Sequence, residues 1–431
     1  MNHINVPFYR KIILYLIIIA VLIDSTTMYK YLTNSPLFGG GFGWPLGFLC
    51  ILYAVQASKL RITNAIKLKL PILILFLLIY VIANNYNAER YLISYVGMFF
   101  FLFIFAYVLY QKGEMRAFLR AFSNVMVAIA IISIFFWLFG SILDILPGRT
   151  QLSYYWADRY RTTYSYYYLY FENPSQNITH GSICNLGIFT ESPGYSGFLT
   201  YALLIEIVLG KNITEKKQKR KAILRTIILI VTLFTTNSTK GIIVVLIALA
   251  IEYVAKEEKS RIKKVIKVLG SLIAIVVVAY ASFTLINGKL ETSSGLVRFD
   301  DLRSGFQTFL DNPVFGAGYN NVDAIIDHQL VTRGNRGLSM GLTTILAYGG
   351  LWLFSIYLGA VVASFRSAYF SLNRKQWILV VIVLLYNLII SNSGFSSPYL
   401  FAIAAAYAAP RATNLRSGNQ NGAKLKKELL I

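Results

Sequence analysis

The chain has 431 residues, of which 56% are hydrophobic and only 14% are charged. Because soluble domains carry about 25% charged residues, this composition excludes a soluble enzyme, and 2 cysteines are too few for a disulfide scaffold. The 41 Lys and Arg residues outnumber the 19 Asp and Glu residues, a net charge of +22. They form short clusters between apolar runs long enough to span a bilayer. The charge therefore does not indicate a nucleic-acid partner, and the sequence predicts a multi-span membrane protein.

The apolar runs predict an all-α polytopic fold of about twelve transmembrane helices, which form a single integral membrane domain over residues 1–431. The predicted spans are 12–29, 38–57, 70–84, 91–110, 121–143, 195–210, 226–237, 241–254, 268–286, 341–365, 376–391 and 396–409. The placement of Lys and Arg orients them. With the N-terminus in the cytoplasm, the inward-facing segments hold 30 of the 41 Lys and Arg residues, as the positive-inside rule requires. Both termini are then cytoplasmic, and residues 410–431 form a basic cytoplasmic tail.

Two connections are long, and both lie on the outer side in this orientation. They cover residues 144–194 and 287–340. Long loops in a compact protein are commonly functional, and both of these are rich in aromatic residues and glycine. We therefore expect ordered loops with short amphipathic helices, and we expect the chemistry to lie there.

Tyrosines crowd the first loop between residues 154 and 170, interrupted by Arg159 and Arg161. One interpretation is an interfacial belt, in which amphipathic rings lie at the level of the lipid headgroups. The other is a platform on which aromatic faces stack against sugar rings. Arg159 and Arg161 could contact phosphate, or they could pair with Asp158 or Glu172.

Two charged residues precede predicted helices on the outer side. Glu191, followed by Ser-Pro-Gly, ends the first loop. Its carboxylate could cap the helix N-terminus, or it could act as a general base or hold a catalytic arginine. Lys240 lies in the short outer connection between two later spans. Its ammonium could contact a lipid phosphate or simply snorkel to the interface.

The second loop contains a predicted amphipathic helix at residues 298–310, with apolar side chains at helical spacing. Arg298 begins this helix on the outer face, where the positive-inside rule does not account for it. A planar guanidinium suits bidentate phosphate binding. The alternative is a surface salt bridge with Asp300 or Asp301.

After this helix comes Asn312-Pro313 and a Gly316-Ala317-Gly318 turn, whose backbone NH groups could approach an oxyanion. His328 follows, with a ring that could accept a proton from an attacking hydroxyl or could simply be solvated. The 3 histidines of the chain are scattered without metal-ligand spacing, so we expect no metal.

The order of these motifs resembles that of the O-antigen ligase and polymerase superfamily. The resemblance lies in Arg298 with its aromatic amphipathic stretch, then Asn312-Pro313 and Gly316-Ala317-Gly318 closed by Tyr319, all in a large outer loop. It implies a multi-span glycosyltransferase of the GT-C-like class in a bacterial inner membrane, with its active site facing the periplasm. The implied donor is a glycan on undecaprenyl diphosphate, whose diphosphate is the leaving group, so no cofactor is required.

The details of the resemblance favour a Wzy-type O-antigen polymerase. Lys240 stands where ligases often carry an arginine, and residues 337–342 lack the histidine that ligases place before the next span. Residues 189–193 instead resemble the Glu-Pro element of many polymerases. The resemblance implies that Arg298 engages the diphosphate and that Glu191 or His328 accepts the proton of the acceptor hydroxyl. The remaining predicted substrate-binding residues are Arg303, Arg333, Arg336, Lys240, Arg159, Arg161 and Tyr319.

The expected partners are a lipid-linked oligosaccharide donor and acceptor, membrane lipids and a chain-length regulator protein. Two rivals stay open. A ligase shares the donor but passes the glycan to lipid A-core. A transporter would place ionisable residues within the membrane, for which Asp24, Glu206 and Glu252 are the candidates.

Overall fold

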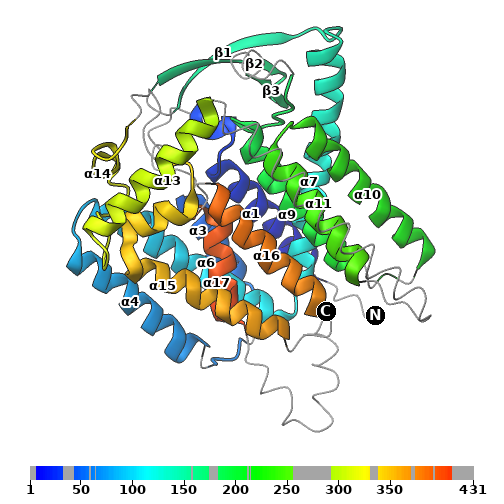
Figure 1. The fold of residues 1–431 in the computed structure, drawn as a ribbon. Coiled ribbons are helices and arrows are strands. Elements are labelled where there is room, and N and C mark those ends of the chain that lie inside the picture. The colour runs from blue at the N-terminus through cyan, green and yellow to red at the C-terminus, as the bar shows by residue number, and fades with distance from the viewer. Residues whose placement is uncertain are drawn as a thin grey trace, which may run out of the picture. The chain divides into compact units, whose positions relative to one another are not determined.

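A computed structural model describes residues 6–32, 43–57, 60–63, 65–156, 159–173, 183–210, 213, 215–255, 293–330, 338–369, 374–391 and 394–409 (Figure 1). The chain divides into two compact units. Unit 1 comprises Met1–Val125, Tyr154–Tyr160 and Asp300–Ile431, and unit 2 comprises Met126–Ser153 and Arg161–Phe299. Three elements have residues in both units: helix α7 (Met115–Phe136), helix α13 (Ser293–Asp311) and the β-sheet.

Unit 1 is a helical bundle centred on α6. Its helices are α1 (Phe8–Asp24), α2 (Met28–Leu32), α3 (Gly43–Val55), η1 (Ala65–Lys69), α4 (Leu70–Ala83), α5 (Ala88–Tyr91), η2 (Leu92–Gly97), α6 (Met98–Lys112), α14 (Val322–Ile326), α15 (Gly341–Tyr369), α16 (Arg374–Ile390) and α17 (Ser397–Ala408). Helices α3 and α17 pack on α6, α1 packs on α3, and α15 packs on α16 and α17. The long apolar side chains of α6 fill this core, where Phe103, Phe105 and Leu109 are fully buried.

Within the described residues, 5 helices are long and apolar enough to cross a membrane, at Ile66–Ala83, Ala88–Lys112, Met115–Ile142, Ser192–Gly210 and Gly341–Arg366. Shorter apolar helices lie at Gly43–Val55, Thr239–Ala248, Val380–Ile390 and Ser397–Ala408. A helix overlies each predicted span except 268–286, which lies outside the described residues, as do residues 410–431. The structure thus supports a polytopic membrane protein, and the number of spans stays a prediction.

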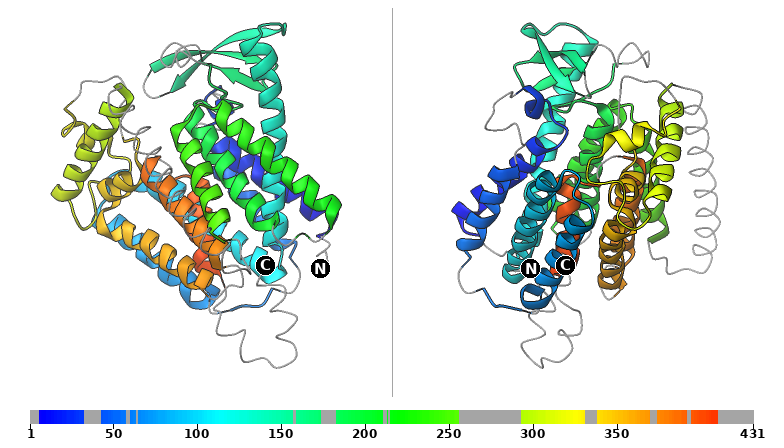
Figure 2. Two further views of the ribbon diagram at one scale, coloured as in Figure 1. Left: turned by 45° about the vertical axis from the view of Figure 1, so that its right-hand side comes forward. Right: turned by 90° about the vertical axis from the view of Figure 1, so that its left-hand side faces the viewer.

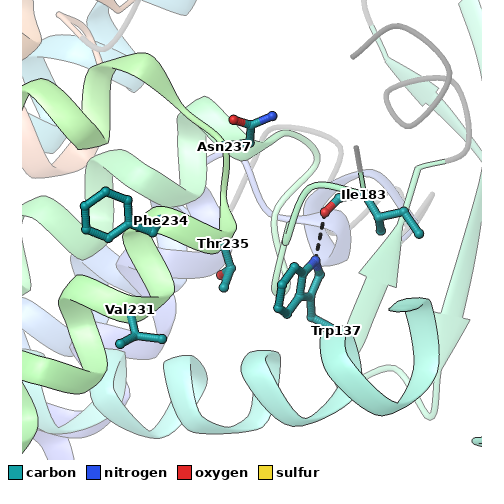
Figure 3. Close-up of a pocket in the computed structure, with 6 residues that line it drawn as sticks. All are labelled: Trp137, Ile183, Val231, Phe234, Thr235 and Asn237. Atoms are coloured by element: carbon teal, nitrogen blue, oxygen red, sulfur yellow. Dashed lines mark hydrogen bonds between the residues drawn. The ribbon is translucent and has the colours of Figure 1, made fainter. Parts of the chain in front are cut away.

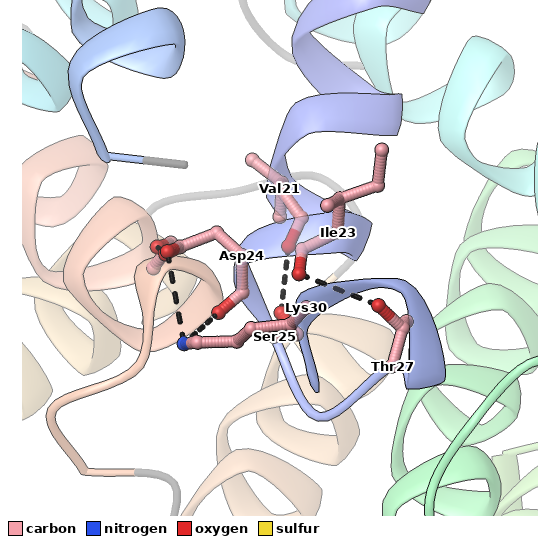
Figure 4. A network of polar contacts seen from close by, with 7 residues as sticks. Val21, Ile23, Asp24, Ser25, Thr27 and Lys30 are labelled. Atoms are coloured by element: carbon pink, nitrogen blue, oxygen red, sulfur yellow. Dashed lines mark hydrogen bonds and ion pairs between the residues drawn. The ribbon is translucent and has the colours of Figure 1, made fainter. Parts of the chain in front are cut away.

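A polar network holds the turn that joins α1 to α2 (Figure 4). Lys30 Nζ donates to the backbone oxygen of Asp24 at 2.6 Å and lies 3.8 Å from its carboxylate. The hydroxyl of Ser397 donates to the same carboxylate. The hydroxyls of Ser25 and Thr27 bond back to carbonyls of α1. Asp24, one of the ionisable residues considered for a transporter, therefore ties the end of α1 to the start of α17.

Unit 2 contains η3 (Trp137–Ile142), α9 (Ser192–Gly210), α10 (Lys216–Thr235) and α11 (Thr239–Ala255), and α9 packs on both α10 and α11 (Figures 1 and 2). A Cβ added at Gly241 would lie 2.9 Å from Leu233 Cδ2 and 3.3 Å from Ser196 Cβ. The close packing of these helices therefore depends on a residue without a side chain, as is common in membranes. Buried Glu206 of α9 pairs with Arg225 of α10 at 2.8 Å.

The first loop departs from the all-α expectation, because it forms a three-stranded sheet where we predicted short helices. The strands are β1 (Arg149–Trp156), β2 (Arg159–Tyr166) and β3 (Tyr170–Glu172), in the order β1-β2-β3. Strand β2 pairs antiparallel with β3, with Tyr166 opposite Tyr170. Threonine and tyrosine favour the half-buried surface of a pleated sheet, and this composition decides the outcome.

In the second loop, residues 298–310 lie in helix α13 as predicted, and the turn that follows this helix is docked into a break in α15. The break lies at Gly350, which has φ 57° and ψ −160°. The backbone NH groups of Ala317 and Gly318 donate to carbonyls of α15 at 2.8 and 3.2 Å. In return, the NH of Leu351 donates to Pro313 O at 2.9 Å. This exchange of hydrogen bonds satisfies backbone groups that the broken helix leaves open.

Candidate active site

Glu191 lies at the start of α9, on a firmly anchored segment. Its carbonyl accepts the first helical hydrogen bond, from Tyr195 N at 3.2 Å. The rings of Phe189 and Tyr195 stack with centroids 5.1 Å apart. The Tyr195 hydroxyl lies 2.8 Å from Ser133 Oγ of α7. The backbone around Glu191 is therefore held on both sides by buried contacts.

Asn185 is the main anchor of this segment, and it is fully buried. Its side-chain Nδ2 donates to Ser133 Oγ at 3.2 Å and to Thr235 Oγ1 at 3.0 Å. Its Oδ1 accepts from Gly187 N at 3.0 Å. One amide thus joins α7, the end of α10 and the segment that leads to Glu191. The sequence does not single out this residue, because a lone Asn in a loop carries no signal of long-range contacts.

Lys240 lies in the first turn of α11 and is 7% exposed. A Cβ added at Gly197 of α9 would lie 3.0 Å from Lys240 Nζ, so the ammonium lies directly over this glycine. Beside it, Ser196 Oγ donates to Ser238 Oγ at 3.0 Å. Gly197 makes room for the cation, and its place in the Pro-Gly-Tyr-Ser-Gly run after Glu191 is the only sequence signal of that role.

Three cations act on the Glu191 carboxylate within unit 2. In order of strength they are Lys240, Arg298 of α13 and Arg161 of β2. Burial raises the pKa of Glu191 above that of an ordinary carboxyl, and the three positive charges oppose this rise. The structure therefore gathers one carboxylate and three cations from a loop end, two helices and a strand.

The salt bridges considered for Arg298 are not formed in the part of the chain that the structure describes. Asp300 Oδ1 accepts from Leu330 N at 3.0 Å, and the Asp301 carboxylate accepts from Ser339 N at 2.9 Å and from the Ser339 hydroxyl. Both carboxylates are buried and hold the second loop to α13. The charge of Arg298 instead acts on Glu191.

His328 lies at the other end of α13. Its Nε2 is 2.7 Å from Asp311 Oδ2, and Asp311 is the last residue of that helix. Thirteen residues separate Arg298 from Asp311, which is about 20 Å along a helix axis. Within unit 2 the charge of Arg298 acts on Glu191, whereas His328 pairs with the last residue of α13.

Of the other predicted residues, Arg303, Tyr319 and Arg159 belong to unit 1. Arg303 is exposed on α13, and Tyr319 packs edge-on against Tyr91 and Phe395, with ring centroids 5.4 Å apart in both pairs. Arg159 lies in β2. Arg333 and Arg336 lie outside the described residues.

The Gly-x-Gly turn packs against α15 and does not offer its NH groups to an oxyanion. The NH of Gly316 donates to Asn312 O at 2.8 Å, and those of Ala317 and Gly318 are bonded to α15. A Cβ at Gly316 would lie 2.5 Å from backbone atoms of Gly349 and Tyr348. These glycines therefore allow two backbones to pack closely, and their NH groups are already occupied.

An open recess of about 580 Å³ lies on unit 2 (Figure 3). Trp137 forms one wall and donates from Nε1 to Ile183 O at 2.8 Å. The opposite wall belongs to α10 and the turn after it. The lining residues are Trp137, Ile183, Val231, Phe234, Thr235 and Asn237. Thr235 is a partner of Asn185, so the recess shares a wall with the framework that holds Glu191.

Residues 224–358 match the family described as O-antigen ligase. The match confirms the resemblance predicted from the sequence and supports membership of the O-antigen ligase and polymerase superfamily. The matched segment includes Lys240 and Arg298, whereas Glu191 and Arg161 precede it. No curated protein and no solved structure matches the chain. This match over part of the chain supports an activity of the O-antigen ligase or polymerase type.

Proposed function

We propose that the protein is a polymerase of O-antigen or a related surface polysaccharide. It transfers the growing glycan from undecaprenyl diphosphate to a lipid-linked repeat unit at the periplasmic face of the inner membrane. The observation that carries the proposal is the cluster in unit 2, where Lys240, Arg298 and Arg161 act on Glu191. A concentration of cations around one carboxylate of raised pKa suits a reaction with an anionic leaving group and a proton to be removed.

In the proposed reaction, a hydroxyl oxygen of the acceptor sugar attacks the anomeric carbon of the donor glycan. The bond between that carbon and the diphosphate oxygen breaks, and undecaprenyl diphosphate leaves with the electron pair. Lys240 and Arg298, with Arg161, stabilise the negative charge that develops on the departing diphosphate. Glu191 accepts the hydroxyl proton, and its raised proton affinity makes it a better base than an ordinary carboxylate.

Two features favour polymerase over ligase. Residues 337–342 lack the histidine expected of a ligase. Glu191, in its polymerase-like Glu-Ser-Pro setting, is the carboxylate on which Arg298 acts. A base supplied by the first loop makes a histidine from the second loop unnecessary.

A deletion strain tests the proposal and separates it from the ligase alternative. Loss of a polymerase leaves lipid A-core that bears a single repeat, whereas loss of a ligase leaves bare core. Complementation with Arg298→Ala at normal membrane levels should keep the single-repeat product. Arg366→Ala, which removes an exposed arginine from the last turn of α15, is the control and should restore long chains. Long-chain product from the Arg298→Ala strain would contradict the proposed role of Arg298 in the polymerase.

A further inference from the structure

The turn between β2 and β3 carries two consecutive tyrosines in a left-handed backbone conformation. Tyr167 has φ 53° and Tyr168 has φ 59°, and Leu169 N closes the turn on Tyr166 O at 2.9 Å. A hairpin turn with two positive φ angles is normally made by Asn-Gly or Gly. Bulky side chains rarely adopt such angles, because the Cβ crowds the backbone. The turn therefore keeps its aromatic rings at an energetic cost.

Specific contacts hold this conformation in place. The Tyr167 hydroxyl donates to Pro147 O at 3.1 Å. A Cβ added at Gly148 would lie 2.6 Å from that hydroxyl oxygen. Ser165 Oγ accepts from Tyr168 N at 2.9 Å. The ring of Tyr167 thus locks the turn onto the backbone that precedes β1.

Tyr167 and Tyr168 are both exposed on this locked turn, to 57% and 53%, and Tyr167 makes the contact that locks it. Strained backbone that the surroundings maintain is concentrated at functional sites. An exposed aromatic face on a rigid support offers stacking at little cost in conformational entropy, as binding surfaces rich in tyrosine do.

The turn belongs to the same framework as the Glu191 cluster. Strand β2 contains Arg161, whose charge acts on Glu191, and reaches the turn after Tyr166. The five steps from Arg161 to Tyr166 span about 17 Å along a strand. On the return strand, Phe171 N donates to Gly187 O at 2.9 Å, in the segment that leads to Glu191. Tyr168 therefore lies beyond the reacting groups by a length that several linked sugar units would cover.

We propose that Tyr168 forms a distal glycan subsite, which stacks on a sugar ring of the donor chain several units from the bond being broken. The proposal rests on the polymerase function. The subsite engages only donors long enough to reach the turn, and so it favours extension of chains that are already long.

The test compares donors that carry one repeat unit with donors that carry many, using the full-length protein in membranes. Tyr168→Gly removes the ring and also relieves the left-handed strain, so a folding defect is not expected. We expect unchanged transfer from the one-repeat donor and a KM for the long donor about fivefold higher, the size of a lost aromatic contact. Tyr168→Trp should restore the low KM. Tyr160→Gly, which removes another exposed tyrosine of the sheet, should leave both values unchanged.

The results separate a distal subsite at Tyr168 from a structural role of its ring. An unchanged KM for the long donor in Tyr168→Gly overturns the distal subsite, as does an equal loss with both donors or in Tyr160→Gly. These results would fit a ring that anchors the sheet in lipid or supports folding. Absence of transfer by the wild-type protein from either donor would instead reject the proposed function itself.

Discussion

Glu191 is subject to two opposing influences, and its response to pH follows from them. Burial raises its pKa, and Lys240, Arg298 and Arg161 lower it again, with the rise prevailing. A general base acts only when it is deprotonated, so kcat/KM should fall as the pH falls through this pKa. We expect this fall in kcat/KM, the acid limb of the pH profile, to occur at a higher pH than the pKa of an ordinary glutamate, which is about 4.3. Glu191→Gln should abolish most of the activity.

The acid side of the pH profile of kcat/KM should also shift to higher pH when Lys240 is replaced. Because Lys240 is the strongest of the charges that lower the pKa of Glu191, Lys240→Met should raise that pKa and shift the acid limb to higher pH. The rate of glycan transfer against pH, measured in membranes, gives both curves. A limb that stays in place in Lys240→Met would contradict the electrostatic coupling.

Replacement of Gly197 tests the position of the Lys240 ammonium without removing its charge. In Gly197→Ala the new methyl group would lie 3.0 Å from Lys240 Nζ, so the ammonium must shift by a few tenths of an ångström while the helix gains a better helix former. We expect stability to be unchanged or higher and transfer to fall about tenfold, or about 1.4 kcal/mol of transition-state stabilisation.

Gly210→Ala is the matched control for this variant. Among the described residues, a Cβ at Gly210, on the same helix, would meet Ala222 Cβ alone at 3.8 Å, an ordinary contact. The two variants should therefore have similar melting temperatures and different transfer rates. Equal rates would show that the position of Lys240 over Gly197 has no functional weight.

The broken helix α15 and the turn at residues 312–320 form one structural element, so Gly316 belongs to folding and not to catalysis. Gly316 has φ 70°, and a Cβ there would lie 2.5 Å from backbone atoms that cannot move aside. We expect Gly316→Ala to lower the free energy of unfolding by about 2–4 kcal/mol, as steric clash and a strained φ commonly do. Thermal unfolding in detergent measures this. A stable protein that transfers slowly would instead support the oxyanion role.

Elements with a strong periodic signal could be predicted from the sequence, and the others could not. Apolar runs and the amphipathic pattern of residues 298–310 located the helices because burial in lipid or against a bundle imposes that pattern. The sheet of the first loop is not predicted, because the dense tyrosines of residues 154–170 fit a lipid belt or a sugar platform equally well. Alternation of Thr and Tyr in β2 was the available strand signal.

Across the whole molecule, the charged residues of the candidate site can be predicted from the sequence, but their proximity in space cannot. Glu191, Lys240 and Arg298 were each singled out from local context, while the packing of α9, α10 and α11 brings Glu191 and Lys240 together. His328 shows the limit of that reasoning. A histidine in the right loop looked as suitable as Glu191, and only its bond to Asp311 places it at the far end of α13. Asn185 and Gly197 act through long-range contacts that no local pattern encodes.

Glycan extension by the purified protein tests whether Glu191 and Arg298 carry out the transfer. The substrate is a single repeat unit linked to undecaprenyl diphosphate, and the products to be measured are longer lipid-linked glycans and free undecaprenyl diphosphate. The wild-type protein should form both in equal amounts per transfer, and Glu191→Gln and Arg298→Ala should form neither above about one-hundredth of that rate. Extension by Glu191→Gln at the wild-type rate would show that Glu191 is not the base.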